Sequence, residues 1–285
     1  MTPLERVGIV GCGLMGSGIA EVCARAGLDV LVSEVDEEAV EAGRERIHTS
    51  LERARKRGKV TEEEEARILS VLRFTIDLGD MADRELVIEA VPESERLKLE
   101  VFGALDKVVA DDAILASNTS SIPIMKLAMA TTRPRKVVGI HFFSPVPVLK
   151  LVELVPSLWT DEPTIEAAES FATGLGKQVI RCKDRAGFIV NALLIPYIIQ
   201  AIRMLESGFA TEEDIDHGMV LGCNHPMGPL ALADFIGLDT TMAAAQSLYD
   251  EFKEPLYAPP PLLSRMVEGG LLGRKTGRGF YVYDE

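Results

Sequence analysis

The sequence predicts an α/β protein with a Rossmann-like, doubly wound, mostly parallel sheet, a helical-arm insertion and a second, all-α domain. Short apolar strands alternate with helical stretches up to residue 181. A glycine-rich turn joins the first strand to the first helix. From residue 187 onward helical spacing replaces the strands. We therefore expect two domains, residues 1–185 and residues 186–285.

The composition limits the classes of partner. The chain has 285 residues, of which 47% are hydrophobic and 26% are charged, as is typical of a globular protein. Its net charge of −14 argues against nucleic acid or an anionic membrane surface as a partner. The longest apolar run, residues 188–199, is too short to span a bilayer and is predicted to be a buried helix.

The cysteines and the start of the chain suggest a cellular location. Cys12, Cys23, Cys182 and Cys223 are scattered and form no Cys-x-x-Cys pair. We therefore expect no metal site and no disulfide, and we expect reduced thiols in a cytoplasmic protein. The first predicted strand starts close to Met1, so we expect no signal peptide.

The first predicted strand, Arg6–Val10, leads into a glycine turn and then into a helix that runs to Arg25. Gly11 allows a tight turn, and Gly13 allows a pyrophosphate to approach the backbone. Gly16 allows the helix to pack closely against the sheet. The free N–H groups and the positive dipole end of this helix would then face the phosphates.

A second predicted strand, residues 28–33, ends at Glu34, about 20 residues beyond the glycine turn. A carboxylate at this position accepts hydrogen bonds from the ribose hydroxyls of NAD and repels the 2′-phosphate of NADP. The order of strand, turn, helix, strand and acid therefore predicts an NAD site rather than an isolated tight turn.

A pair of helices separates the second strand from the third. The first is predicted from about Asp36 to Arg57, and the second opens with a capping box at Thr61 and runs to about Leu72. Basic residues gather around the turn between these helices: Arg53, Arg55, Lys56, Arg57 and Lys59. This basic island is either a solvated helix end, where basic side chains are favoured, or a grip on an anionic ligand.

Further strands are predicted at residues 73–75, 86–90, 114–117, 137–142, 149–155 and 177–181, with helices at residues 95–109 and 162–175. In the second domain, Thr211 marks a helix start, and the segment 226–229 separates two helices. A glycine-rich loop begins at Lys275. The first helix of this domain is strongly apolar, and a small domain can bury such a helix by association with a second copy of the chain. We therefore expect a homodimer.

Polar side chains follow the predicted strands at their carboxyl ends, where open parallel sheets bind ligands. The run Ser117-Asn118-Thr119-Ser120-Ser121 follows one strand, and His141 closes the next. Glu153 lies in the strand-like segment after it, and Asn191 lies within the apolar helix of the second domain.

These residue types suit the oxidation of an alcohol by NAD. A histidine takes up the hydroxyl proton near neutral pH, and a carboxylate on its other ring nitrogen holds the required tautomer. We therefore pair His141 with Glu153. We expect Ser120 to hold the substrate oxygen and Asn191 to position His141 or the substrate carbonyl. The competing interpretations are a core histidine, an exposed strand glutamate and a packing asparagine.

Taken together, the motifs resemble the 3-hydroxyacyl-CoA dehydrogenase family over essentially the whole chain. The matching segments are Gly11–Gly16, Ala116–Ser121, His141–Val148, Lys150–Glu153, Asp184–Asn191, Pro226–Pro229 and Lys275–Tyr281. The resemblance implies a Rossmann-like domain and a helical domain through which the protein forms a homodimer.

The resemblance also implies a role for each matching residue. His141 is the catalytic base with Glu153 as its partner, and Ser120 and Asn191 contact the substrate. The cofactor-binding positions are Gly11, Gly13, Leu14, Met15, Gly16, Glu34, Glu93, Lys98, Asn118, Ser144 and Lys275. Ser144 stands where the family commonly has asparagine. The CoA-binding positions are Ser50, Arg57 and Ser120. Arg57 replaces a frequent lysine and keeps the charge, so the basic island is expected to bind CoA phosphates.

The resulting hypothesis is the NAD-dependent oxidation of a short-chain (S)-3-hydroxyacyl-CoA to the 3-ketoacyl-CoA, or the reverse reduction. Two alternatives stay open. One is a dehydrogenase of a free hydroxy acid or sugar acid on the same fold, and the other is a non-catalytic NAD-binding protein. The basic island favours CoA, and the four polar residues favour catalysis.

Overall fold

A single sheet positions His141, Glu153 and the polar run Ser117–Ser121. The computed structural model describes residues 4–283. The strands are β1 (Arg6–Val10), β2 (Asp29–Ser33), β3 (Leu72–Thr75), β4 (Leu86–Glu89), β5 (Ile114–Ser117), β6 (Val137–Phe142), β7 (Leu151–Pro156) and β8 (Gln178–Arg181). Their spatial order is β3-β2-β1-β4-β5-β6-β7-β8. Neighbouring strands are parallel except β6 and β7, which are antiparallel. The predicted, mostly parallel sheet is confirmed.

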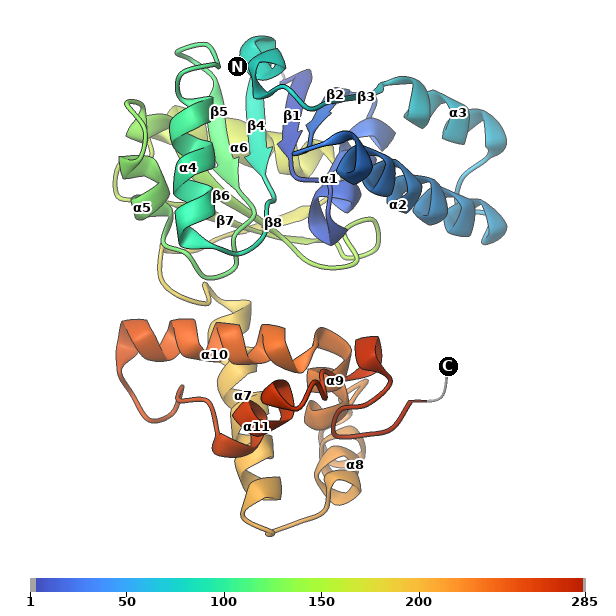
Figure 1. Ribbon diagram of the computed structural model, residues 1–285, viewed down its shortest axis with the longest axis vertical. Helices are drawn as coiled ribbons and strands as arrows, with labels where there is room; N and C mark the ends of the chain where they lie inside the picture. The colour runs from blue at the N-terminus through green and yellow to red at the C-terminus, as the bar shows by residue number, and fades with distance from the viewer. Residues whose placement is uncertain (1–3, 284–285) are drawn as a thin grey trace. The chain divides into compact units, whose positions relative to one another are not determined.

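The order of the strands explains where ligands can bind. β1 pairs with β2 on one side and with β4 on the other, so the order in which successive strands join the sheet reverses at β1, although the three strands are parallel. Such a switch point opens a crevice beyond the carboxyl ends of the strands. Apart from Arg6 at the start of β1, the residues of β1, β4 and β5 are buried, since both faces of the sheet are covered. Figure 1 shows α4 and α5 in front of the sheet and α6 behind it.

The helices of this first part are α1 (Leu14–Arg25), α2 (Glu37–Lys56), α3 (Glu62–Ser70), α4 (Glu95–Leu105), α5 (Ile124–Met129) and α6 (Glu162–Gly174), with 3-10 turns η1 (Leu78–Asp83) and η2 (Pro134–Lys136). Asp36 starts α2 by accepting a hydrogen bond from the backbone N–H of Ala39 (2.8 Å). Thr61 and Glu64 form the predicted capping box of α3. Figure 1 shows α2 and α3 extending beyond the sheet, as the predicted arm requires.

Two elements start later than the sequence pattern predicts. β7 begins at Leu151 rather than residue 149, because the N–H groups of Val148 and Leu149 bond to the Pro145 carbonyl in a turn. The apolar helix α7 (Val190–Glu206) begins after residue 188. Gly187 and Phe188 have φ angles of +74° and +48°, which an α-helix does not accept.

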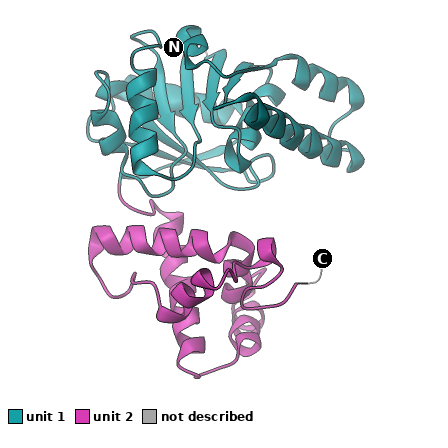
Figure 2. Ribbon diagram, viewed as in Figure 1, with its two compact units in different colours: residues 1–184 teal, residues 185–285 magenta. Residues whose placement is uncertain are grey.

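The chain divides into two compact units, up to Asp184 and from Arg185 onward (Figure 2). The second unit is helical, as predicted. Its elements are α7, α8 (Glu212–Cys223), α9 (Pro229–Ile236), α10 (Leu238–Phe252), α11 (Pro261–Glu268) and the 3-10 turn η3 (Arg274–Thr276). Between residues 4 and 283, no helix has both the length and the apolar character that a membrane crossing requires.

Buried carboxylates hold the second unit together. Asp216, on α8, accepts hydrogen bonds from the N–H groups of Leu230 (2.8 Å) and Ala231 (2.9 Å) at the start of α9. Asp234, on α9, accepts from the N–H groups of Phe280 and Tyr281, both at 3.0 Å. These bonds satisfy helix-end and loop donors that sequence periodicity does not reveal.

Candidate active site

The glycine turn after β1 has the shape expected for a dinucleotide site. Gly11 has a φ angle of +92°, and a Cβ there would lie 2.9 Å from the Ala90 carbonyl oxygen. A Cβ at Gly16 would lie 1.8 Å from the Gly11 carbonyl oxygen. At Gly13 a Cβ would meet nothing within 4 Å, so this side of the turn is open. The turn is thus closely packed against the protein at two glycines and accessible at the third.

The start of α1 can receive an anion. Gly13 is its N-cap, no side chain caps this end, and no acidic residue lies in its first turn. Leu14 is exposed, while Met15 packs against the hydrophobic core. An uncapped helix start next to an open glycine fits a pyrophosphate. The pyrophosphate would accept hydrogen bonds from the first N–H groups of α1 and would be attracted by the positive end of the helix dipole.

Glu34 directly follows β2, and its carboxylate lies beside the glycine turn. Its carboxylate accepts hydrogen bonds from the N–H of Cys12 and, at 3.3 Å, from that of Val35. Arg46, from α2, donates to the Cys12 carbonyl oxygen at 3.3 Å. The acid is therefore held beside the turn, as a ribose ligand must be. The contribution of Arg46 was not predicted, because only the packing of α2 onto the turn reveals it.

His141 and Glu153 face each other across β6 and β7, which pair in register at these two residues. The Nδ1 atom of His141 lies 2.7 Å from Oε2 of Glu153. Only 6% of the His141 surface and none of the Glu153 surface is exposed. The Phe143 ring lies 4.6 Å from the imidazole, centre to centre. The predicted pairing is therefore present as a direct, buried contact.

The polar run after β5 is tied to its neighbours at two points. Asn118 accepts a hydrogen bond from the Phe142 N–H through Oδ1 (2.9 Å), which links the ends of β5 and β6. Oε1 of Glu93 accepts from the N–H groups of Ser120 (3.0 Å) and Ser121 (3.2 Å) and from the Thr119 hydroxyl (2.5 Å). Ser120 is thus held by Glu93 at the carboxyl end of the sheet.

A buried ion pair stabilises the carboxylate that holds the loop after β5. Lys98 is 1% exposed, and its Nζ lies 2.6 Å from Glu89 Oε1 and 3.2 Å from Glu93 Oε2. Glu89, fully buried at the end of β4, also accepts from the Ser117 hydroxyl at 2.7 Å. Burial raises the pKa of Glu89. Burial also acts to raise the pKa of Glu93, but the Lys98 charge and several hydrogen bonds hold it below its ordinary value.

This geometry gives the contacts of one expected residue and adds another. Lys98, expected to line the cofactor site, directs its ammonium to the carboxylates of Glu89 and Glu93. Glu89 was not predicted to take part. A charged residue at the end of an otherwise apolar strand was the signal that could have identified it.

Three further predicted residues of the first unit lie in the loop after β6 and on the arm. Ser144 is exposed in the loop after β6, Ser50 is half-buried on α2, and Arg57 is exposed at the end of α2. Asn191, on α7, and Lys275, on η3, belong to the second unit, where Nζ of Lys275 contacts both carboxylate oxygens of Asp239 at 2.6 Å. Over residues 4–283, no group of three or more His, Cys, Asp and Glu side chains could hold a metal ion.

Known proteins of similar sequence and structure cover nearly the whole chain. Residues 6–185 match the NAD binding domain of 3-hydroxyacyl-CoA dehydrogenase, and residues 187–283 match its C-terminal domain. The chain is 62% identical to a 3-hydroxybutyryl-CoA dehydrogenase from Mycobacterium tuberculosis, over 98% of this chain and 99% of that protein. It is 41% identical to the mitochondrial hydroxyacyl-coenzyme A dehydrogenase of Sus scrofa, over 98% and 91%. The crystal structure of (S)-3-hydroxybutyryl-CoA dehydrogenase from Ralstonia eutropha is similar with a TM-score of 0.95 at 46% identity, over 99% and 100%.

Proposed function

The chain belongs to the 3-hydroxyacyl-CoA dehydrogenase family, and on this basis we propose how its residues carry out the reaction. The protein is an NAD-dependent oxidoreductase that converts a 3-hydroxyacyl-CoA to the 3-ketoacyl-CoA or catalyses the reverse reduction. We infer the (S) configuration and a short acyl chain, because similar proteins are named for (S)-3-hydroxybutyryl-CoA. The observation that carries the proposal is the buried His141–Glu153 pair at the carboxyl end of β6.

His141 acts as the catalytic base in this proposal. The Glu153 carboxylate holds the proton on Nδ1, so Nε2 presents its lone pair to the substrate hydroxyl. When Nε2 takes the hydroxyl proton, the buried carboxylate stabilises the imidazolium that forms. In the reduction, the same imidazolium returns the proton to the carbonyl oxygen. The short Nδ1–Oε2 distance of 2.7 Å supports this assignment.

Ser120 and Asn191 are proposed to hold the substrate. The Ser120 hydroxyl is a donor at the carboxyl end of the sheet, where it can bond to the reacting oxygen. The Glu93 carboxylate limits the positions that this hydroxyl can take, because it accepts hydrogen bonds from both the Ser120 N–H (3.0 Å) and the Ser120 hydroxyl (3.4 Å). Asn191 is assigned to the substrate carbonyl or to His141 on the family resemblance.

The cofactor is NAD. The open face at Gly13 and the uncapped start of α1 fit its pyrophosphate, and Glu34 fits the adenosine ribose. When bound, NAD supplies a nicotinamide ring that accepts the hydride from the substrate carbon. We propose that Asn118, oriented by its bond to Phe142, and Ser144 contact the nicotinamide side. Glu93 and Lys98, which are paired at 3.2 Å, are proposed to line this site, and Lys275 is proposed to contact the cofactor.

The basic island on the arm is proposed to bind the CoA phosphates. Arg55 is paired with Glu65 at 3.0 Å and Lys56 with Glu52 at 2.8 Å. Arg53, Arg57 and Lys59 are exposed, and none of them has an ion-pair partner among residues 4–283. These three remain available for an anionic ligand, with Ser50 one turn earlier on the same helix.

We also propose a cytoplasmic homodimer that forms through the helical unit. Large apolar side chains are exposed on this unit: Leu193, Phe209, Leu221, Phe235 and Val282. Association of two chains through this unit would remove such side chains from water. The cysteines of the described chain are free, which suits a reducing compartment.

One assay separates this function from its alternatives. Acetoacetyl-CoA and free acetoacetate are each offered with NADH, and NADH oxidation is followed. We expect turnover with the thioester and at least about 100-fold lower kcat/KM with the free acid, since the CoA contacts are lost. Equal rates would favour a dehydrogenase of free hydroxy acids. Absence of oxidation with either compound would favour a non-catalytic NAD-binding protein.

A further inference from the structure

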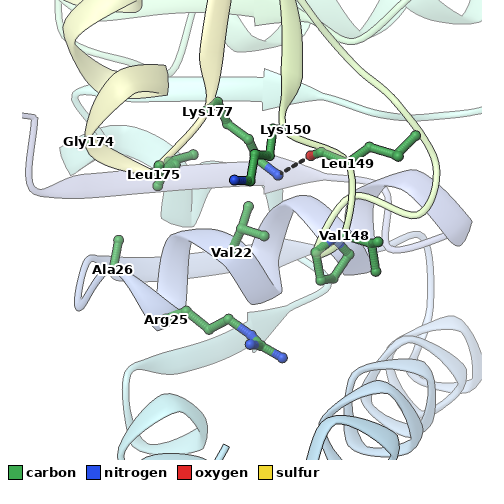
Figure 3. Close-up of a pocket in the computed structure, with 11 residues that line it drawn as sticks. Val22, Arg25, Ala26, Val148, Leu149, Lys150, Gly174, Leu175 and Lys177 are labelled. Atoms are coloured by element: carbon green, nitrogen blue, oxygen red, sulfur yellow. Dashed lines mark hydrogen bonds between the residues drawn. The ribbon is translucent and has the colours of Figure 1, made fainter. Parts of the chain in front are cut away.

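A cavity of about 370 Å³ lies in the first unit and is separate from the residues assigned above. Its walls are the end of α1, the loop between β6 and β7, and the turn between α6 and β8 (Figure 3). None of its lining residues has been assigned to the substrate or to NAD. The question is what chemistry these walls would bind.

Lys177 is the most buried charge in this cavity, with 8% of its surface exposed. Its ammonium donates to the carbonyl oxygens of Val146 (2.5 Å) and Leu149 (2.8 Å), and Figure 3 shows the second of these bonds. Within residues 4–283, no carboxylate lies at ion-pair distance from it. The nearby Cys23 thiol supplies no counter-charge, because burial raises its pKa and keeps it neutral.

The ammonium of Lys177 can donate one more hydrogen bond. It has three donors, and two of them have carbonyl partners. A buried cation without a counter-charge is unfavourable, and burial accordingly lowers the pKa of Lys177. An anion in the cavity would provide both the third acceptor and the missing charge.

The other charged side chains in the lining are also basic. Lys150 is exposed, and it directly follows Leu149, whose carbonyl Lys177 binds. Arg25 also lines the cavity, but its guanidinium is already paired with Glu21 at 2.6 Å. No lining residue is acidic, although the whole chain has 44 acidic and 30 basic residues. A positive cavity in so acidic a protein is a selective environment for an anion.

At the helix ends that border the cavity, backbone N–H groups of the following turns bond to carbonyl oxygens. At the end of α6, the Ala172 carbonyl accepts from the Lys177 N–H at 3.2 Å. At the end of α1, the Cys23 carbonyl accepts from the Leu28 N–H at 3.2 Å.

We propose that this cavity binds a multiply charged small oxyanion, with Lys177 and Lys150 as its ligands. Its volume is at the lower end of the roughly 300–1,000 Å³ range of small-molecule sites, so an inorganic phosphate or a small polycarboxylate fits. The bound anion would also hold Lys177 in place against the loop that leads from His141 to Glu153. That loop packs on α1, since a Cβ at Gly18 would lie 2.9 Å from the Val146 Cβ.

The proposal is tested by calorimetric titration of the whole protein with inorganic phosphate and, separately, with citrate. NADH is present at saturation, so that the glycine turn of the protein is already occupied by the cofactor and cannot bind the added anion. We expect saturable binding of one anion per chain, and the stronger of the two ligands identifies the class. Lys150→Glu should weaken binding at least about tenfold, since it reverses one ligand's charge. It leaves the buried Lys177 intact.

Lys107→Glu is the matched control, because Lys107 is an exposed lysine near the end of α4 and does not line the cavity. This variant should bind the anion as the unchanged protein does. Lys177→Met, if it folds, should abolish binding. Two results would overturn the proposal: no saturable binding of either anion, or equal binding in Lys150→Glu and the unchanged protein. The second result would place the anion elsewhere, for example on the arm. The readout is binding, so it is independent of the proposed catalytic role of His141.

Discussion

The His141 imidazole and the Glu153 carboxylate are direct partners across the antiparallel strands β6 and β7, with 2.7 Å between Nδ1 and Oε2. Twelve residues separate them in the chain. Their contact depends on the register of two strands that run in opposite directions, so the backbone itself positions the pair. This arrangement gives the imidazole one fixed tautomer before any substrate binds.

The first prediction concerns this pair. His141→Gln should lower kcat by about 10²–10⁴-fold, since the group that takes the proton is lost. The dissociation constant for NADH should stay within about twofold, because no contact of the glycine turn changes. Stopped-flow turnover and fluorescence titration measure the two quantities. Near-normal turnover would remove His141 from the role of base.

Glu153→Gln should lower kcat by a similar factor while His141 remains present. A glutamine amide can donate to Nδ1 and hold the proton on Nε2, so Nε2 no longer accepts a proton. Glu166→Gln, an exposed change of the same kind on α6, is the control and should be neutral. If Glu153→Gln retains full kcat, the carboxylate does not set the tautomer.

Substitutions at Gly13 and Gly16 should separate cofactor binding from folding stability. Gly13→Ala places its methyl group in open space, so the melting temperature should change little. The dissociation constant for NADH should rise at least about tenfold, because the methyl group blocks the approach of the pyrophosphate. Gly16→Ala would place a Cβ 1.8 Å from the Gly11 carbonyl oxygen and should lower the melting temperature markedly. Normal NADH affinity in Gly13→Ala would place the pyrophosphate elsewhere.

The Glu93 carboxylate should make the loop after β5 sensitive to acid. Burial acts to raise the pKa of Glu93, but the Lys98 charge and the bonds from Thr119, Ser121 and Ser120 outweigh it, and the folded-state pKa is lowered. The unfolded chain therefore binds this proton more tightly, and the stabilisation present above about pH 4.3 is lost as the pH falls through the folded-state pKa. Melting curves of the unchanged protein and Glu93→Gln should accordingly converge in acid. A constant difference at all pH values would contradict this assignment.

The buried pair of Lys98 and Glu89 should behave as one unit. Lys98→Met leaves the Glu89 charge without its cation and should destabilise the protein by about 3–5 kcal/mol. Adding Glu89→Gln should recover part of this loss, because the uncompensated charge disappears. Urea unfolding of both single variants and the double variant measures the coupling. Additive effects of the two changes would show that the ion pair is not what supports the loop.

Local patterns in the sequence already specify the framework of this protein. The spacing of Gly11, Gly13 and Gly16 between an apolar strand and a helix predicts the turn. Each glycine is required because a larger side chain would obstruct the turn, the cofactor or the packing of the helix. Alternating apolar strands and helices predict the sheet, and Thr61 with Glu64 predicts a helix start. These features depend on neighbours in the chain, so a reader of the sequence can find them. His141 and Glu153 were paired on chemical grounds, and their distance and register came from the fold.

Only the tertiary structure decides where charged side chains point. Lys98 turns inward to Glu89 and Glu93, and Lys177 is buried beneath a loop that begins more than 30 residues earlier in the chain. These orientations follow from the packing of strands and loops that are distant in sequence, and from the need of each buried charge for a partner. Periodicity and motif spacing report which residues share a face or a turn. They carry no information on which distant group satisfies a buried ammonium or carboxylate.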